Sequence, residues 1–379
     1  MTADPIPLAQ ALIRRPSITP TDAGALDVLQ RALEALGFRV QRLKFGEVDN
    51  LYARLGTEAP HFCFAGHTDV VPVGDAAAWS VDPFAAEIRD GLLYGRGAAD
   101  MKAAIACMVT SVQNHIAAHG APKGSISFLI TGDEEGPAVD GTKKVLEAIT
   151  AAGEKIDHCL VGEPTSVSDV GDVIKNGRRG SLNCVIEIIG HQGHAAYPAL
   201  AANPVTPLLE ALHKLKSRKL DDGAPGFDPS NLEVTTFDVG NLAHNVIPAK
   251  ASAKLNIRFN TAHKAEDLSA WIETIARESA ARAGCEANVR IAVTGHPFYT
   301  APGAFTDLVQ AAVRETLGAA GKLSTSGGTS DARFIKDYAQ VAELGLQNDT
   351  AHKIDERVRI DDVRALSRVY GDILKRYFA

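Results

Sequence analysis

The sequence predicts a two-domain α/β protein, in which a mostly parallel sheet is interrupted by an inserted ferredoxin-like domain of the order β-α-β-β-α-β. Three observations support this prediction. A chain of 379 residues is long for one compact domain. Strands and helices alternate in the first and last parts of the chain, and the order changes between them. We therefore expect one domain from residues 1–179 and 296–379, and an inserted domain from residues 180–295.

In the first part of the chain, the spacing of apolar residues predicts each element. Leu26, Leu29 and Leu33 recur at helical spacing before Gly37, which is typical of a helix over residues 25–37. The elements expected after it are strands 38–45, 51–55 and 62–65, helix 101–119, strand 125–131, helix 141–152 and strand 158–161. This alternation favours a largely parallel sheet with helices on both faces.

The order of elements changes near Gly180 and changes back after His296. The inserted domain is expected to contain strand 181–190, helix 204–217, strands 232–240 and 249–260, helix 265–283 and strand 287–294. The chain then continues with helix 304–318, a glycine-rich loop over 325–331, strand 340–344 and helix 360–377. We expect this last part to complete the first domain, with the inserted domain acting as a lid.

Composition favours an ordinary globular protein and gives no sign of a nucleic acid or membrane partner. Hydrophobic residues make up 45% of the chain, and the net charge of −7 is not accompanied by a basic tail. No apolar run approaches the ~18 residues of a membrane span, and the first residues do not resemble a secretory signal. The five cysteines form no Cys-x-x-Cys pair and mostly lie in apolar runs, so we expect a reduced, cytoplasmic protein.

Histidines and carboxylates stand at the ends of apolar runs along the whole chain. These residues are His67, Asp69, Asp100, Glu134, Glu135, Glu163 and His352. Because the carboxyl ends of parallel strands share one edge of a sheet, we expect these side chains to converge there. Two histidines with four or five carboxylates are the ligand set of a two-metal hydrolase.

Each of these residues has another explanation when it is considered alone. Asp100 suits a helix N-cap, Glu134 and Glu135 suit a solvated turn before Gly136-Pro137, and Glu163 and His352 suit surface loops. Only the combination favours a metal site. Within it, one of the two adjacent glutamates would bind metal while the other moves a proton. Asp69 suits a hydrogen bond to a metal-bound imidazole of His67 better than ligation.

Four of these segments resemble the metal motifs of the M20 metallopeptidase family, and the match extends across the whole chain. The segments are Gly66-His67-Thr68-Asp69-Val70-Val71-Pro72, Gly95-Arg96-Gly97-Ala98-Ala99-Asp100-Met101-Lys102, Thr131-Gly132-Asp133-Glu134-Glu135 and Val161-Gly162-Glu163-Pro164. The resemblance implies two Zn²⁺ ions per chain, with Co²⁺ as a possible substitute. His67 and Glu163 would hold one ion, Glu135 and His352 the other, and Asp100 would bridge them. Glu134 would be the general base, Asp69 the partner of His67, and a cis peptide bond would follow Asp100.

Four further segments resemble the M20 members that hydrolyse N-succinyl-L,L-2,6-diaminopimelate during lysine and diaminopimelate biosynthesis. They are residues 175–181, 193–198, 245–248 and 326–334. The implied substrate-binding residues are Lys175, Arg178, Ser181, Tyr197, Asn245, Arg258, Gly328, Thr329, Arg333 and Asn348. The implied assembly is a homodimer through the inserted domain, in which His194, Tyr197 and Asn245 reach the partner's site and His194 stabilises the oxyanion. Ala332 and His244 depart from the family pattern and affect only the expected substrate preference.

Two other functions are compatible with the same metal motifs. One is another M20 deacylase such as an acetylornithine deacetylase, which shares the ligands but not the need for Arg178 or the 326–334 segment. The other is a catalytically inactive metal-containing scaffold, against which the intact Glu134 argues. Dinucleotide binding is not favoured, because Gly95-Arg96-Gly97 lacks the third glycine of the fingerprint.

Overall fold

A computed structural model describes residues 2–379, which form two compact units. Unit 1 contains the residues up to Asn176 together with Thr300–Ser324 and Ser330–Ala379, and unit 2 contains Gly177–Tyr299 and Thr325–Thr329. The expected insertion at 180–295 lies inside unit 2, but the short return at 325–329 was not expected. Two hydrogen bonds explain it: Thr325 Oγ1 donates to the Gly226 carbonyl (2.7 Å), and Arg178 Nη1 donates to the Gly328 carbonyl (3.0 Å).

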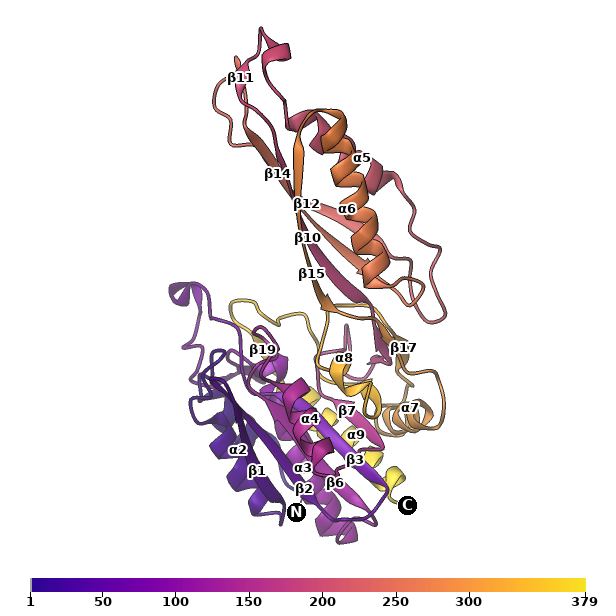
Figure 1. Ribbon diagram of the computed structural model, residues 1–379. Coiled ribbons are helices and arrows are strands. Elements are labelled where there is room, and N and C mark those ends of the chain that lie inside the picture. The colour runs from indigo at the N-terminus through magenta and orange to yellow at the C-terminus, as the bar shows by residue number, and fades with distance from the viewer. Residues whose placement is uncertain (1) are drawn as a thin grey trace. The chain divides into compact units, whose positions relative to one another are not determined.

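Unit 1 is built on an eight-stranded sheet of order β1-β2-β6-β3-β7-β18-β8-β17 (Figure 1). Its strands are β1 (Arg39–Phe45), β2 (Val48–Leu55), β3 (His61–His67), β6 (Ser125–Thr131), β7 (His158–Val161), β8 (Val173–Lys175), β17 (Lys322–Ser324) and β18 (Gln340–Glu343). The central pairs β6–β3, β3–β7 and β7–β18 are parallel, as is β8–β17. The pairs β1–β2, β2–β6 and β18–β8 are antiparallel, so the sheet is mixed with a parallel centre.

Both faces of the central strands are covered, since every residue of β3 and β6 is buried. The helices of unit 1 are α1 (Ile6–Ile13), α2 (Ala25–Glu34), α3 (Ala103–His119), α4 (Thr142–Ala151), α7 (Ala304–Leu317), α8 (Ala332–Ile335) and α9 (Ile360–Tyr377). Helix α9 contacts both α3 and α7, and the three helices share one apolar core with Phe64 and Phe128. The buried side chains of α4 lie outside that core, and α4 contacts α8. None of the helices within residues 2–379 combines the length and apolar character needed to cross a bilayer.

The helix expected from Met101 begins two residues later. Residues Ala98–Lys102 form an irregular turn in which Asp100 and Met101 have non-helical dihedral angles, and α3 begins at Ala103. The peptide bond between Asp100 and Met101 is cis, as the family resemblance implied. Asp100 makes no side-chain cap to α3, so its carboxylate is available for other contacts.

Unit 2 contains a four-stranded antiparallel sheet of order β12-β14-β10-β15 with two helices. The elements run in the order β10 (Gly180–Ile189), α5 (Val205–Ser217), β12 (Asn231–Asp238), β14 (Lys250–Phe259), α6 (Ala265–Arg282) and β15 (Glu286–Gly295). Two small ladders complete the unit: β11 (Gly193–His194) with β13 (Val246–Ile247), and β9 (Gly177–Arg178) with β16 (Phe298–Tyr299). Alternate residues of β10 and β14 pack against α5 and α6, which gives unit 2 its own core.

Three places where the chain leaves or re-enters unit 1 meet at Asn176. The backbone N–H of Asn176 donates to the Ser324 carbonyl (3.2 Å), and the N–H of Thr300 donates to the Asn176 carbonyl (2.7 Å). The Asn176 side chain donates to the Thr300 carbonyl (2.8 Å). Asn176 is buried, so these contacts form one compact junction within unit 1.

Candidate metal centre

The predicted ligands stand at one edge of the central parallel strands. His67 is the last residue of β3, Glu134 and Glu135 follow β6, and Glu163 follows β7. Because β6, β3 and β7 are parallel neighbours, their carboxyl ends lie side by side. This edge therefore collects side chains that are far apart in sequence, as the sequence predicted.

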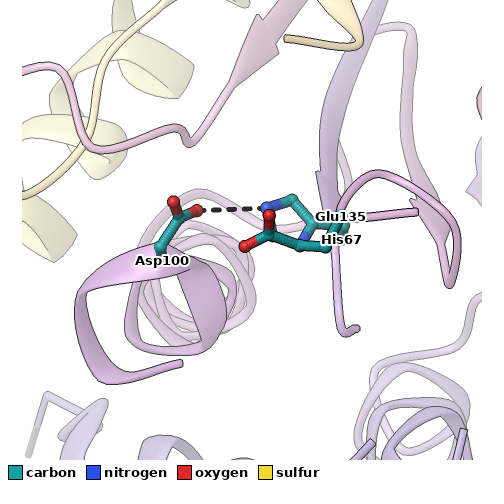
Figure 2. Close-up of side chains that lie close together, drawn as sticks. All are labelled: His67, Asp100 and Glu135. Atoms are coloured by element: carbon teal, nitrogen blue, oxygen red, sulfur yellow. Dashed lines mark hydrogen bonds and ion pairs between the residues drawn. The ribbon is translucent and has the colours of Figure 1, made fainter. Parts of the chain in front are cut away.

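Asp100 lies between the two predicted histidine ligands. Figure 2 shows Asp100 and His67 pointing toward each other. The distance from Asp100 Oδ1 to His67 Nε2 is 3.1 Å, and that from Oδ2 to His352 Nε2 is 3.3 Å. His67 Nε2 is also 3.8 Å from Glu163 Oε1, and His352 Nε2 is 2.8 Å from Glu135 Oε1. The two oxygens of Asp100 thus face two different sets of ligand atoms, which is the arrangement that a bridging carboxylate requires.

The ligand atoms fit metal ions. Nitrogen and carboxylate oxygen atoms lie within 4.8 Å of one another in two groups, His67 with Asp100 and Glu135, and His67 with Glu134 and Glu163. Imidazole and carboxylate together are the donors that zinc and similar divalent cations take in proteins. His67 and Glu163 are buried, and the Asp100 and Glu135 side chains are only 12% and 8% exposed. Carboxylates gathered with so little solvent need cations or protons for compensation.

The pKa values of the two histidines are raised by the negative charge of the carboxylates around them. Hydrogen bonds with Asp100 and Glu135 raise the pKa of His352 to about 10. Burial alone would lower the pKa of His67, but its hydrogen bond with Asp100 raises it well above the ordinary value. Burial would also raise the pKa of Asp100, and its bonds with both histidines instead hold it below the usual range. Divalent cations would compensate the same carboxylate charge and would displace the protons from the histidine rings.

His67 is oriented by the main chain of Asp69. His67 Nδ1 lies 2.9 Å from the Asp69 carbonyl oxygen, which can only accept, so Nδ1 carries the hydrogen and leaves the Nε2 lone pair for a metal. The Asp69 carboxylate is farther away, at 3.6 Å from Nδ1. It instead accepts the backbone N–H groups of Glu134 (3.3 Å) and Glu135 (3.0 Å). Asp69 therefore positions both His67 and the turn that carries the two glutamates.

Glu134 lies beside the ligands and has the environment of a proton carrier. Burial, reinforced by nearby carboxylates, raises the pKa of Glu134 to about 8, although the charge of His67 opposes this. A cation close to Glu134 would favour its ionised form and lower this pKa again. A carboxylate whose pKa lies near neutrality can both accept and donate a proton during a reaction.

Two glycines make room for the segment that carries Asp100. Gly66 directly precedes His67, and Gly162 directly precedes Glu163. A Cβ atom at either glycine would collide with the Met101 side chain. The fully buried Met101 therefore fits against the ends of β3 and β7 and holds its neighbour Asp100 beside the two ligands.

The other predicted site residues of unit 1 are Lys175, Arg333 and Asn348. Lys175 is buried and its Nζ donates to Ser324 Oγ at 3.3 Å. Arg333 stacks on Phe334 (4.6 Å to the ring centroid) and lies 3.8 Å from Asp331. Asn348 is exposed, and its backbone N–H donates to Ser166 in the segment that follows Glu163.

Five predicted substrate-binding residues gather at one end of the unit 2 sheet. Ser181 and Arg258 are register partners on β10 and β14, and Arg178 binds the Gly328 carbonyl, which is followed by Thr329. Burial, together with the charge of Arg179, lowers the pKa of Arg258. Arg178 and Ser181 are buried. This end of unit 2 thus carries positively charged groups suited to an anion.

The other three predicted residues of unit 2 lie at its opposite end. His194 on β11 pairs with Val246, Tyr197 stacks on His194 with ring centroids 5.6 Å apart, and the Asn245 carbonyl accepts from Ala195. Figure 1 shows β11 at the tip of unit 2, beyond the end of β14. The ten-residue β10 separates this group from Ser181, a distance of about 30 Å.

The model of peptidase family M20/M25/M40 matches residues 63–376, a range that contains every residue of the candidate centre. The chain belongs to this family. Succinyl-diaminopimelate desuccinylase of Caulobacter vibrioides strain NA1000 / CB15N is 59% identical over 379 residues, covering 100% of this chain and 97% of the relative. That of Maricaulis maris is 60% identical over 380 residues, covering 99% and 96%.

Solved structures of other proteins show the same fold at low sequence identity. A tripeptidase of Staphylococcus aureus has a TM-score of 0.79 at 21% identity and covers 98% of this M20 chain and 97% of its own. A Bacillus subtilis protein described as a dinuclear metal-binding peptidase from the M20 family has a TM-score of 0.74 at 15% identity, covering 99% and 97%.

Sequence reasoning missed two residues of this M20 centre, Arg96 and Glu356. Both are buried, and they form an ion pair of 2.6 Å between Arg96 Nη1 and Glu356 Oε2. Arg96 was considered only within a glycine-containing motif, and Glu356 stands in a charged segment that resembles a surface loop. No local pattern marks either residue, because their contact joins segments 260 positions apart.

Proposed function

We propose that this M20 enzyme hydrolyses N-succinyl-L,L-2,6-diaminopimelate to L,L-2,6-diaminopimelate and succinate, a reaction of lysine and diaminopimelate biosynthesis. The observation that carries the proposal is the full-length similarity to several succinyl-diaminopimelate desuccinylases at 54–60% identity. The converged ligands and Glu134 supply the groups that a metal-assisted amide hydrolysis needs. The proposed location is the cytoplasm, and its support is that all five cysteines are free.

The proposed cofactors are two Zn²⁺ ions, for which Co²⁺ could substitute. His67 and Glu163 would hold one ion, Glu135 and His352 the other, and Asp100 would bridge both. When bound, the ions supply Lewis acidity, which polarises the scissile carbonyl and lowers the pKa of water. The support for this assignment is that each oxygen of Asp100 faces a different histidine.

Glu134 is the proposed general base. Its carboxylate takes a proton from the attacking water and delivers it to the nitrogen of the departing amine. Asp69 supports this step by holding the backbone of Glu134 and Glu135. His194 would stabilise the oxyanion with a ring N–H.

Substrate recognition is proposed to depend on charge, because the substrate has three carboxylates. Arg178 and Arg258 offer planar guanidinium groups that suit carboxylates, and Lys175 and Arg333 add further positive charge. The proposed hydrogen-bonding residues are Ser181, Tyr197, Asn245, Gly328, Thr329 and Asn348. Arg178 is already held by the Gly328 carbonyl, so it would bind with little loss of conformational freedom.

The proposed homodimer explains the two separated groups of unit 2. Ser181 lies at the start of β10 and His194 lies on β11, beyond the other end of β10, too far apart for one small substrate to contact both within one copy of unit 2. Two chains that exchange the tips of unit 2 would remove this conflict. The tip also exposes large apolar side chains, with Tyr197 63%, Leu200 76% and Leu242 98% exposed. Such a group of exposed apolar side chains is typical of an interface.

A comparison of two substrates tests the proposed activity. The zinc-loaded protein should hydrolyse N-succinyl-L,L-2,6-diaminopimelate with a higher kcat/KM than N-acetylornithine, measured by release of primary amine. The arginines of unit 2 should favour the succinyl carboxylate, which the acetyl group lacks. Faster turnover of N-acetylornithine would transfer the assignment to another M20 deacylase, and no turnover of either compound would favour an inactive scaffold.

A further inference from the structure

Glu356 is a fully buried carboxylate with four hydrogen-bond donors around it. Its Oε1 accepts the backbone N–H groups of Ala99 (2.9 Å) and Asp100 (3.1 Å). Its Oε2 accepts the N–H of Gly97 (3.1 Å) and Nη1 of Arg96 (2.6 Å). The exposed fraction of Glu356 is 0%, so no water competes for these bonds. One side chain therefore fixes the irregular turn that presents Asp100.

The position of Glu356 in the chain connects this turn to a second ligand. Glu356 follows His352 by four residues, and its own carbonyl accepts the N–H of Gly95 (2.9 Å). Both ends of the segment 95–100 are thus attached to the segment that carries His352. A shift of Asp100 relative to the segment that carries His352 would therefore break bonds to Glu356.

Arg96 extends the connection to a third ligand segment. Besides Glu356, its guanidinium donates to the carbonyls of Lys353 (3.2 Å) and Pro72 (3.3 Å). Lys353 directly follows His352, and Pro72 closely follows His67 and Asp69. The guanidinium also lies over the Trp79 ring, 5.2 Å from its centroid, which limits its movement.

We propose that the buried Arg96–Glu356 pair is a positioning device that sets the spacing between Asp100 and His352, and so determines how tightly the ion shared by Asp100, Glu135 and His352 is held. The inference rests on the proposed two-metal function, and it adds two residues that set the affinity for one of the two ions. The other ion depends on His67 and Glu163, which stand directly at the ends of β3 and β7. It should be less sensitive to the pair.

The substitution Glu356→Gln removes half of this arrangement without changing the size of the side chain. A glutamine has one acceptor oxygen and one NH₂ group, so it cannot accept from the Ala99–Asp100 and Gly97–Arg96 sides together. One set of buried donors is then left without a partner, and the turn must shift.

The matched control is Glu154→Gln. Glu154 also forms a largely buried ion pair, with Arg54, and accepts from Tyr52 at 3.2 Å. Its side-chain partners within residues 2–379 are Tyr52 and Arg54, neither of which lies in a ligand segment, so its substitution should cost folding stability without changing metal affinity.

The experiment is a zinc titration of the metal-free wild type, Glu356→Gln and Glu154→Gln proteins against a competing chromophoric chelator. The wild type should bind two ions. Glu356→Gln should bind one ion as the wild type does and the other roughly 10- to 100-fold more weakly. Its lost activity should return when zinc is added in excess. Glu154→Gln should match the wild type in both affinities.

The outcomes separate the two proposals. A wild type that binds fewer than two ions would overturn the two-metal function itself. A wild type with two ions and a Glu356→Gln protein with unchanged affinities would overturn only the positioning role. If Glu356→Gln does not fold, Arg96→Lys serves instead, because lysine keeps the charge but loses the fork that reaches Pro72, Lys353 and Glu356. It should weaken the same ion, and unchanged affinities would again overturn the role.

Discussion

His352 Nε2 lies 2.8 Å from Glu135 Oε1, although 217 positions separate the two residues in the chain. The contact closes the second half of the candidate centre, since Asp100 Oδ2 also faces His352. We predict that His352→Ala lowers the zinc content from about two ions per chain to about one, and abolishes measurable hydrolysis. Metal analysis after gel filtration provides the test.

The control for that experiment is His119→Ala, since His119 is exposed at the end of α3. Its zinc content and activity should equal those of the wild type. Two retained ions in His352→Ala would show that His352 is not a ligand.

Removal of the carboxylate from Glu134 should stop proton transfer while leaving the metals in place. We predict that Glu134→Gln lowers kcat by roughly 10²- to 10⁴-fold, because general base catalysis contributes about that factor. The zinc content should stay near that of the wild type, since Glu134 is not one of the five proposed ligands. Near-normal turnover by a fully loaded Glu134→Gln protein would assign the proton transfer to another group.

A mixed dimer tests whether His194 acts on the partner's site. Glu134→Gln and His194→Ala chains should each be nearly inactive when produced alone. Mixed by co-expression and purified through two different tags, they should regain activity, because one site of each heterodimer would combine an intact Glu134 with an intact His194. A heterodimer as inactive as its parents would contradict sites shared between chains.

We predict that any side chain at position 345 would displace Glu163, so that Gly345 is required there. A Cβ atom on Gly345 would collide with the main-chain carbonyl oxygens of Gly162 and Glu163, which cannot move aside as a flexible side chain can. Gly345→Ala should therefore weaken zinc binding and lower the melting temperature. Gly371→Ala, inside α9 with open space around it, should leave zinc affinity unchanged and raise stability by up to about 1 kcal/mol. Equal zinc affinities in the two variants would refute the steric argument.

Asp221 should make unit 2 sensitive to acid. Burial opposes ionisation of Asp221, but hydrogen bonds from Ser230, Gly223 and Asn260 outweigh it and lower its pKa below the ordinary value. His263 Nε2 lies 2.8 Å from the same carboxylate. A lowered pKa in the folded state contributes stability above the unfolded pKa of about 3.9, and this contribution is lost as pH falls through the folded value.

The substitution that tests this effect is Asp221→Asn. We predict a loss of about 1–3 kcal/mol in the unfolding free energy of unit 2 at pH 7, measured with urea. The difference from the wild type should shrink below about pH 4, where the Asp221 carboxylate of the unfolded wild-type chain begins to take up a proton while that of the folded chain stays ionised. A difference that stays constant between pH 7 and pH 3 would show that the charge of Asp221 is not the cause.

The sequence could predict those ligands that stand at or just after the end of a strand. His67 and Glu163 stand at or just after the ends of β3 and β7, so an apolar run followed by a polar residue was sufficient to find them. The family resemblance supplied the roles that local pattern leaves open, such as the bridging position of Asp100. Near Asp100, helical periodicity continues through a turn that is not helical, because long-range bonds to Glu356 override local propensity.

Other features depend on contacts between distant segments and could not be predicted from local pattern. The 325–329 segment belongs to unit 2 because Thr325 and Gly328 bond to Gly226 and Arg178. The short strand β8 pairs with β17 on one side and with β18 on the other, and three residues carry too little periodicity to identify a strand. The Arg96–Glu356 pair also joins segments far apart in the sequence, so local pattern could not predict it.

The junction at Asn176 would allow most of unit 2 to be deleted from the chain. Since the main chain at Asn176 and at Thr300 is already within hydrogen-bonding distance, a few glycines could replace the 123 residues between them without stretching either end. A shortened protein of this kind would retain all five proposed ligands and lack His194. Such a truncation would show whether the metal-binding half folds and binds zinc without unit 2.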